Sequence, residues 1–391
     1  MKKVKLGDVC KIQSGGTPSR GNLNYWNNGN IPWVKISDIK EKHLSRTEEF
    51  ITQEGLANSS AKIFPKETIL YTIFATLGEV SILEIDATTN QAIAGLQIID
   101  ENICKDYLYY YLISLKPFVN EIGRGVAQNN INMQILRNFE IPLPSLEEQK
   151  AIARKLDKVS GLIEKRKTQH AKLSELVKSR FIELFGDPKL NDKGWTVSAL
   201  GEYMTLLTDF SANGSYELLD SNVVMYDEPN YAVMVRTTDL EAGDLTNGVK
   251  YIDQAAYELL SKSKLFGGEL IMNKIGSAGK IYIMPQIDKP ASLGRNAFMF
   301  RFDGRINMTY LYALLSSDYG TNEIQQYVRG AVTKTITKES TRSIRVIVPP
   351  IELQEQYASF VEQIDKSKFE IQQSLEKLEI LKKSLMQQYF G

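Results

Sequence analysis

The chain of 391 residues has very few of the side chains that build catalytic and metal sites. Cys10 and Cys104 have neither metal-ligand spacing nor Cys or His neighbours, so both are expected to be reduced thiols. With only His43 and His170, there is little material for histidine-based catalysis or metal binding. No stretch approaches about 18 uncharged apolar residues, and the basic start lacks the apolar run of a signal peptide. The sequence therefore predicts a cytoplasmic protein that does not span a membrane.

The chain also lacks a surplus of charge of either sign. Its 47 Lys and Arg residues balance 47 Asp and Glu residues. A neutral chain argues mildly against nucleic-acid binding if the chain works alone. The charge is unevenly distributed, however, since residues 145–186 carry 10 basic and 6 acidic side chains and residues 351–391 carry 5 and 7. Any DNA binding must therefore rest on local clusters or on a basic partner subunit.

What the sequence does contain is a long internal repeat. Residues 124–186 align without a gap with residues 329–391, at an offset of 205 residues. Each copy has an extended apolar run that ends in proline, then LEEQ (146–149) or IELQ (351–354), and each closes on Phe-Gly. A duplicated unit of this size predicts a pseudo-two-fold molecule, and two-fold symmetry in a protein is the usual answer to the two-fold axis of duplex DNA.

A heptad pattern follows the proline in each copy of the repeat. Mostly apolar residues alternate at spacings of four and three along residues 152–184 and 357–389, as in a coiled-coil seam. Polar residues occupy the seam at Arg166, His170, Arg180, Lys368 and Lys382. One helix with such a stripe would be badly exposed, so we expect the two helices to pair, antiparallel, as a rod of about 50 Å. The expected apolar seam residues are Ile152, Leu156, Val159, Ile163, Leu173, Val177, Val361, Ile364, Ile371, Leu375, Leu378 and Leu385.

The two remaining segments predict α+β domains. Both are rich in β-branched and aromatic runs punctuated by Gly, Pro and Asn, which is typical of short strands. Residues 107–119 predict a helix that stops near Pro117. The expected organisation is a domain at 1–144, a spacer helix at 145–186, a second domain at 187–350 and a second spacer helix at 351–391.

The repeat continues weakly inside the two domains. VKISDI at 34–39 matches VRTTDL at 235–240, and YLY at 107–109 matches YLY at 310–312. The loops between the matched positions differ in length and content. This is the expected signature of one fold that presents two different binding surfaces.

Several short strings occur in an order that is typical of one protein family. They are SGGTPS (14–19), YW (25–26), IPW (31–33), ATLGEV (75–80), TTNQA (88–92), and IPLP (141–144) followed by EEQ (147–149). Together with the doubling and the heptad helices, they resemble the specificity subunit of type I restriction–modification systems over nearly the whole chain. The second domain departs from the pattern, because it lacks GGTPS and has Ala232 to Met234 in place of IPW. We interpret this difference as a different target sequence.

The resemblance implies a DNA reader that is not itself an enzyme. In this family, each of two target-recognition domains reads one half of a split, asymmetric DNA site, and paired helices hold the domains at a fixed separation. Two methyltransferase (modification) subunits dock on the helices, and restriction subunits, which are motor nucleases, can join the assembly. The implied partners are double-stranded DNA and these subunits, and no cofactor or metal is expected.

Candidate DNA-reading residues are polar side chains in Gly-, Ser- and Thr-rich loops, since base edges are read by hydrogen bonds while phosphate contacts set the register. Guanidinium and amide groups suit guanine and adenine edges. The candidates in the first domain are Thr17, Ser19, Arg20, Lys35, Ser37, Asn90, Gln91, Arg124, Gln128, Asn129 and Asn130. Those in the second are Arg236, Thr237, Lys274, Ser277, Lys280, Arg295, Asn296, Arg329, Thr333, Lys334 and Thr335. The alternative interpretation of each is a solvated loop residue or a turn former.

Two hypotheses of different classes remain. The first is the DNA-specificity subunit, favoured by the family-like strings and by unlike domains on a duplicated framework. The second is a coiled-coil scaffold that joins two protein- or ligand-binding domains without nucleic acid, which the zero net charge favours. The sequence contains no motif that would support a third hypothesis, a self-contained enzyme. The string GSAGK at 276–280 does not have the spacing of a phosphate-binding loop.

Overall fold

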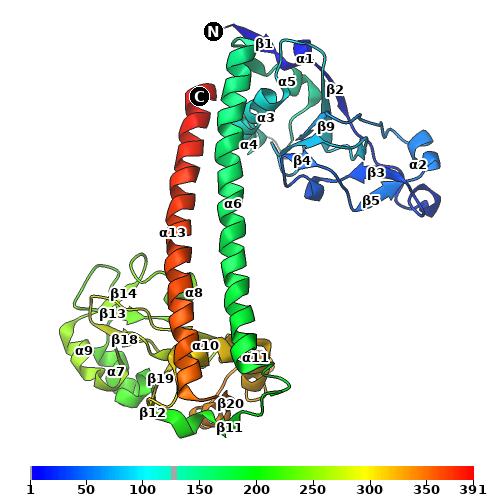
Figure 1. The fold of residues 1–391 in the computed structure, drawn as a ribbon. Helices are drawn as coiled ribbons and strands as arrows, with labels where there is room; N and C mark the ends of the chain where they lie inside the picture. Colours follow the sequence, from blue (N-terminus) through cyan, green and yellow to red (C-terminus); the bar gives the residue numbers. More distant parts are fainter. Residues whose placement is uncertain (1, 125–129) are drawn as a thin grey trace. The chain divides into compact units, whose positions relative to one another are not determined.

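The structure is a computed structural model that describes residues 2–124 and 130–391 (Figure 1). Its contacts divide the chain into two compact units: unit 1 is Met1–Thr168 with Ile371–Gly391, and unit 2 is Gln169–Glu370. Each unit holds one α+β domain and part of both long helices, α6 (Leu146–Phe185) and α13 (Ile351–Phe390). Among the helices of the described residues, none combines the length and apolar character needed to cross a membrane.

Unit 1 is built on three sheets of short strands. The first has the order β2-β9-β6-β7-β4 and comprises β2 (Cys10–Ser14), β4 (His43–Leu44), β6 (Ile69–Thr72), β7 (Val80–Leu83) and β9 (Ile93–Ile98). The second has the order β5-β3-β8 and comprises β3 (Ile31–Val34), β5 (Glu49–Ile51) and β8 (Thr88–Thr89). The third pairs β1 (Lys3–Lys5) with β10 (Glu140–Pro142). The helical segments are α1 (Leu6–Val9), η1 (Leu23–Tyr25), η2 (Ile36–Asp38), α2 (Gln53–Ala57), α3 (Lys105–Ser114), α4 (Lys116–Arg124) and α5 (Met133–Arg137).

The helix expected at residues 107–119 is two helices in the structure. α3 ends at Ser114 and α4 begins at Lys116, so Pro117 lies in the first turn of α4. The expectation was wrong because proline is tolerated in the first turn of a helix, where its missing N–H would have no partner.

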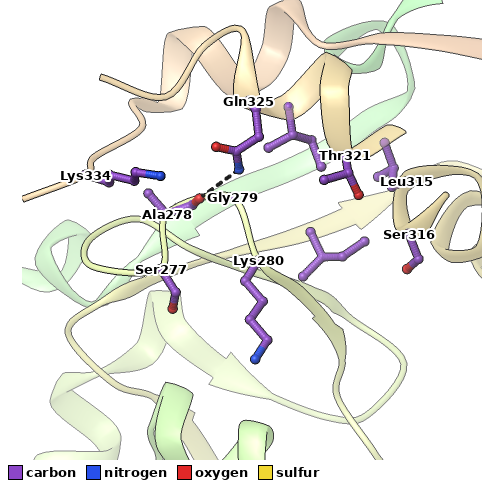
Figure 2. A pocket seen from close by; sticks show the side chains of 11 residues that line it. Ser277, Ala278, Gly279, Lys280, Leu315, Ser316, Thr321, Gln325 and Lys334 are labelled. Atoms are coloured by element: carbon purple, nitrogen blue, oxygen red, sulfur yellow. Dashed lines mark hydrogen bonds between the residues drawn. The ribbon is translucent and has the colours of Figure 1, made fainter. Parts of the chain in front are cut away.

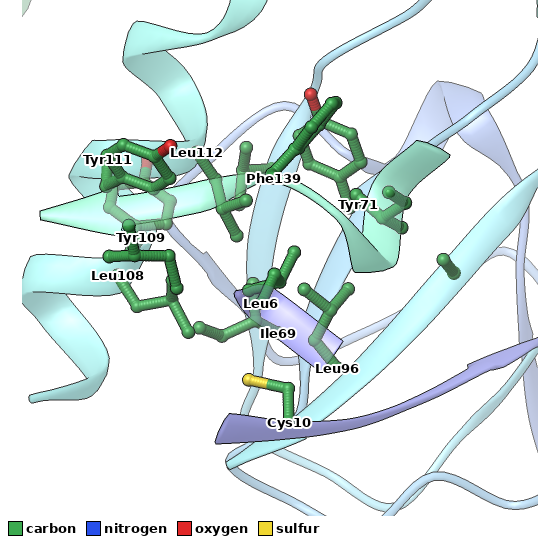
Figure 3. Close-up of a cluster of buried hydrophobic side chains, with 14 of the residues drawn as sticks. Leu6, Cys10, Ile69, Tyr71, Leu96, Leu108, Tyr109, Tyr111, Leu112 and Phe139 are labelled. Carbon is green, nitrogen blue, oxygen red and sulfur yellow. The ribbon is translucent and has the colours of Figure 1, made fainter. Parts of the chain in front are cut away.

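The main core of unit 1 packs α3 and α1 against the five-stranded sheet. Figure 3 shows Cys10 beside Leu6, Ile69 and Leu96 in this core. Burial raises the pKa of the Cys10 thiol to about 12. The thiol therefore stays protonated at neutral pH, which makes it a small hydrophobic core residue rather than a nucleophile.

Unit 2 repeats the plan of unit 1 with its own strands. One sheet has the order β12-β19-β16-β17 and comprises β12 (Met204–Asp209), β16 (Leu270–Asn273), β17 (Ile281–Ile283) and β19 (Ala297–Phe302). A second has the order β14-β13-β18-β15 and comprises β13 (Ala232–Val235), β14 (Lys250–Ile252), β15 (Lys264–Leu265) and β18 (Ala291–Leu293). β11 (Thr196–Ala199) pairs with β20 (Arg345–Val348). The helical segments are η3 (Leu200–Tyr203), η4 (Phe210–Asn213), α7 (Tyr216–Asn222), α8 (Thr237–Ala242), α9 (Gln254–Leu259), η5 (Ser261–Ser263), α10 (Met308–Ser316), α11 (Asp318–Gln325) and α12 (Lys338–Ser343).

The strand pairings show that the two units share one topology. β9 lies between β2 and β6 in unit 1, as β19 lies between β12 and β16 in unit 2. The parallel pair β3–β8 in unit 1 has its counterpart in the parallel pair β13–β18 in unit 2. The α+β fold expected for each domain is confirmed, and it occurs twice.

The long helices pair with each other, and within unit 1 their direction is antiparallel. Lys155 Nζ donates to the hydroxyl of Tyr389 over 3.3 Å, whereas Lys167 lies near Lys382. Residue numbers therefore rise along α6 as they fall along α13. The twelve expected seam residues are all buried or partly buried, and in unit 2 the α6 and α13 segments share one apolar cluster.

A buried glutamine joins the start of each long helix to the neighbouring α+β domain. The Gln149 side chain accepts from the N–H of Cys104 over 2.9 Å and donates to the carbonyls of Asn102 and Pro144 over 2.8 and 3.0 Å. Gln354 repeats this arrangement: it accepts from the N–H of Asn307 over 2.8 Å and donates to a proline carbonyl over 2.7 Å. Both glutamines are fully buried, which explains the glutamine of the LEEQ and IELQ strings.

Replacing Gln354 with alanine is expected to lower the free energy of unfolding by about 1–3 kcal/mol, since the N–H of Asn307 and the carbonyl of Pro349 would lose their partner while remaining largely out of water. The matched control is Gln363→Ala on the same helix, where the glutamine is exposed. This control should change stability by less than about 0.5 kcal/mol. Urea unfolding of the full chain, followed by circular dichroism, measures both. Equal losses in the two variants would contradict the anchoring role of Gln354.

Candidate nucleic-acid interface

The predicted reading loops meet along one edge of the α+β domain in each unit. In unit 1, the N–H of Gly16 donates to the carbonyl of Thr89 over 2.8 Å, and the N–H of Asn90 donates to Val34 over 3.0 Å. The N–H of Ile73 donates to the carbonyl of Ala92 and joins the β6–β7 turn to these loops. The N–H of Ile131 donates to the carbonyl of Ile73 and joins the segment after α4 to that turn. We call this set of loops the loop edge of unit 1; it comprises residues 15–20, 34–38, 73–79, 88–92 and 130–131.

Unit 2 has an equivalent loop edge, held by the counterparts of three of these backbone bonds. The N–H of Gly294 donates to the carbonyl of Val235 over 2.8 Å, and the N–H of Lys274 donates to the carbonyl of Asn296 over 2.9 Å. The N–H of Ile336 donates to the carbonyl of Lys274 over 3.1 Å. The loop edge of unit 2 comprises residues 235–239, 274–280, 292–297 and 329–336. The two edges therefore place different side chains on one backbone framework.

In unit 1, the loop edge brings several predicted residues together. The hydroxyl of Thr17 donates to the amide oxygen of Gln91. Arg20 donates to Glu49 over 2.5 Å, and its guanidinium lies 3.7 Å from the ring centre of Trp26. Lys35 pairs with the same Glu49 over 3.3 Å and with Glu48 over 2.8 Å. Both cations are thus restrained, and Lys35 at least is largely neutralised by two carboxylates.

The other predicted residues of unit 1 occupy less constrained positions. Ser19 and Ser37 are exposed, and the Asn90 side chain accepts from the N–H of Ala92 over 3.1 Å. Asn130 pairs with Phe74 through a backbone bridge. Arg124 ends α4, and its side chain lies outside the described residues together with Gln128 and Asn129.

In unit 2, four predicted residues line one pocket of about 320 Å³, which we call the arginine pocket. Arg236 is held by Asp239 through two bonds of 3.0 and 2.6 Å, and the Arg236 N–H donates to the same carboxylate over 2.9 Å. Arg295 pairs with Asp220 over 3.1 Å. The pocket is lined by Phe210, Val223, Met225, Met234, Arg236, Thr237, Thr238, Gly294, Arg295 and Asn296. It therefore combines an apolar lining with guanidinium and amide donors.

Three more predicted residues line a second pocket, of about 370 Å³, at the turn between β16 and β17 (Figure 2). We call it the hairpin pocket, and Ser277, Lys280 and Lys334 contribute to it. Lys280 pairs with Glu241, and Ser277 accepts from the Asn273 side chain over 2.6 Å. The GSAGK string lies in this strand-to-strand turn, so it does not form the strand-to-helix turn of a phosphate-binding loop.

Lys274 belongs to a buried ion cluster beneath the loop edge of unit 2. Its Nζ lies 2.9 Å from a carboxylate oxygen of Asp209, and Nζ of Lys338 lies 2.7 Å from the other oxygen. Burial alone would raise the pKa of Asp209, but the hydrogen bonds from the two lysines outweigh it and lower this pKa below its usual value. The cluster carries one net positive charge and holds both lysines in place.

The last predicted residues form the loop after α11. Arg329 and Thr335 exchange backbone bonds of 2.9 and 2.8 Å, and Thr333 is exposed between them. The guanidinium of Arg329 donates to the carbonyl of Gln326 over 2.5 Å, at the end of α11. Arg329 thus stabilises a helix terminus, which is one of the structural roles open to it from the sequence.

The sequence reasoning missed the acidic partners of the predicted cations. Asp209, Asp220, Asp239 and Glu241 each pair with one of them, and Glu49 pairs with two. Only Asp239, three residues after Arg236, had a detectable signal, because it belongs to the repeated VKISDI/VRTTDL match. A cation held by a carboxylate adds little net positive charge but presents its donors in a fixed direction, as the reading of base edges requires.

Comparison with known proteins shows which family the chain resembles. The sequence model of the "Type I restriction modification DNA specificity domain" matches residues 1–174 and again residues 193–382. The type I restriction enzyme MjaIX specificity subunit of Methanocaldococcus jannaschii is 26% identical over 93% of this chain and 85% of its own length. The EcoR124I/EcoR124II specificity subunit of Escherichia coli is 31% identical over 40% of each chain.

The fold is shared with a solved protein as well. The crystal structure of the type I restriction–modification S subunit from M. genitalium superimposes with a TM-score of 0.58 at 16% identity, covering 100% of this chain and 96% of that one. Since the domain model matches almost the whole chain in two copies, this chain belongs to the family of DNA specificity subunits of type I restriction–modification systems.

Proposed function

We propose that the chain reads a bipartite, asymmetric DNA site, with one half bound by each α+β domain and the spacing set by the paired helices. The observation that carries this proposal is the repeated loop edge: three equivalent backbone bonds hold both edges, while their side chains differ. Because the same framework presents Gln91 in unit 1 but Arg295 in unit 2, the two half-sites should differ in sequence. A scaffold without nucleic acid does not account for membership of a DNA-specificity family.

The net charge of the two loop edges limits how tightly this chain alone can bind DNA. Most predicted cations are paired with carboxylates, so this chain supplies little net charge to neutralise phosphates. Each half-site alone should therefore be bound weakly. A rigid connection makes the second engagement intramolecular, which raises affinity without new contacts. We attribute much of the phosphate neutralisation to partner subunits.

We infer that the chain also docks the subunits that carry out catalysis, because its family consists of specificity subunits of restriction enzymes. We propose that two methyltransferase subunits bind along α6 and α13, and that restriction subunits join through them. Leu176 on α6 and Leu381 on α13 occupy equivalent positions of the repeat, and each is 46% exposed. Two equivalent exposed leucines on a duplicated helix favour two copies of one partner.

Domain exchange tests the proposal. Replacing residues 187–350 with the corresponding segment of a relative should change one half of the methylated sequence and leave the other half and the spacer unchanged. The reciprocal exchange of residues 1–144 is the matched control and should change only the other half. Sequencing of methylated bases in genomic DNA, from cells with and without each gene, provides the measurement. A change in both halves, or in neither, would contradict the proposal that each α+β domain reads one half of the site.

A further inference from the structure

The same turn exposes a large apolar side chain in both units. Phe74, in the turn between β6 and β7, is 43% exposed, and Ile275, in the turn between β16 and β17, is 42% exposed. Each is the second residue after its strand, and each is fixed by a backbone bridge, from Phe74 to Asn130 and from Ile275 to Thr335. The two positions are therefore structurally equivalent.

The apolar character of this position contrasts with the residues around it. Single exposed apolar residues are common on protein surfaces. Here the turns share Gly78 and Gly279 but differ in charge, with Glu79 in one unit and Lys280 in the other at the same place. A partly exposed apolar side chain, Phe74 or Ile275, therefore occurs in both turns although the charge of the turn differs. In both units it lies among loops that carry polar candidates for base reading.

Unit 2 carries a second apolar group on the adjoining loop. Val332, between Arg329 and Thr335, is 98% exposed. Its loop is joined to the turn by a bond of 3.0 Å from the N–H of Gly276 to the carbonyl of Lys334, and by the bridge of Ile275 with Thr335. The turn and the loop therefore present Ile275 and Val332 from paired segments of one loop edge.

We propose that Phe74 in unit 1, and Ile275 with Val332 in unit 2, are hydrophobic contacts to the 5-methyl groups of thymines in the two half-sites. This inference rests on the proposed function. The thymine methyl is the apolar group that a base edge presents in the major groove, beside hydrogen-bonding groups. Amide and guanidinium side chains of the same edges, such as Asn296 and Arg295, suit the hydrogen-bonding groups, whereas an exposed aliphatic or aromatic side chain suits the methyl.

The test uses the full chain in complex with its methyltransferase subunits. Once the site is mapped, each thymine is replaced in turn by uracil, which lacks only the methyl group, and affinity is measured by fluorescence anisotropy. At one thymine of the half-site read by unit 2, uracil should weaken binding about fourfold, as expected for one methyl group removed from an apolar contact. Ile275→Ala should weaken binding to the thymine site and reduce or abolish the uracil effect. Phe74→Ala should act likewise, but only on the other half-site.

The control variant is Leu190→Ala, which removes a 72% exposed apolar side chain of unit 2 that lies outside the loop edge. It should leave both affinity and the uracil effect unchanged. The inference is overturned if uracil has no effect at any position of a tightly bound specific site, or if Ile275→Ala leaves the uracil effect intact. It is also overturned if Ile275→Ala weakens binding equally on all sequences. If the complex with the unaltered chain bound all DNA sequences equally, that result would instead refute the proposed function itself.

Discussion

Removal of one heptad from each long helix is expected to shorten the spacer of the recognised DNA site by about three base pairs. Seven residues span about 10 Å of helix, and base pairs are stacked about 3.4 Å apart. Seven residues are also close to two full turns, so the helix faces rotate by only about 20° and the seam stays aligned. The complex should bind the site with its original spacer at least about 100-fold more weakly, because the two half-sites can no longer be engaged together.

The deletions are placed so that each seam keeps its phase. Removing residues 166–172 from α6 brings Leu173 into the position of Arg166, and removing residues 368–374 from α13 brings Leu375 into the position of Lys368. The matched control deletes only residues 166–172, which leaves helices of unequal length and should destabilise their pairing. Methylated-base sequencing in cells that carry each variant reports the preferred spacer. An unchanged spacer in a stable double-deletion variant would contradict the proposal that the paired helices set the spacing.

The fold could be predicted from the sequence largely because the chain repeats itself. The heptad spacing of residues such as Leu156 and Leu375 indicated paired helices, and the family-like strings in residues 14–92 indicated the α+β domains. Local patterns were less reliable at boundaries. Pro117 was expected to end a helix, yet it lies in the first turn of the next one, because the effect of a proline depends on whether it stands in the first turn or the interior.

The candidate site was harder to predict, because most of its ion pairs join residues far apart in the chain. Arg20 and Glu49 are 29 positions apart, and Lys338 and Asp209 are 129 apart. No spacing rule connects such partners, so the sequence could suggest the cations but not their neutralisation. The glutamines 149 and 354 were visible as part of a repeated string, but only the fold shows which backbone groups they satisfy.

The second large effect is expected at the aromatic residue that ends α6. Phe185 is 3% exposed and lies 4.6 Å from the ring of Tyr310, 4.9 Å from Phe181 and 5.6 Å from Tyr357. Phe185→Ala should lower the free energy of unfolding by about 3–5 kcal/mol, since it leaves a large cavity in the core that joins the helices to the α+β domain of unit 2. The matched control, Phe369→Ala, removes a ring that is 64% exposed and should cost less than about 0.5 kcal/mol.

The repeat supplies a third variant that separates this explanation from a general need for the Phe-Gly ending. Phe390 is the counterpart of Phe185 at the end of α13; in unit 1 its ring lies 5.3 Å from Tyr107 and 5.9 Å from Tyr111. Because Phe390 is only partly buried, Phe390→Ala should cost less than Phe185→Ala but more than Phe369→Ala. Chemical unfolding of the full-length variants gives the order. If Phe185→Ala and Phe369→Ala proved equally mild, the aromatic cluster would not be what fastens the end of α6 to unit 2.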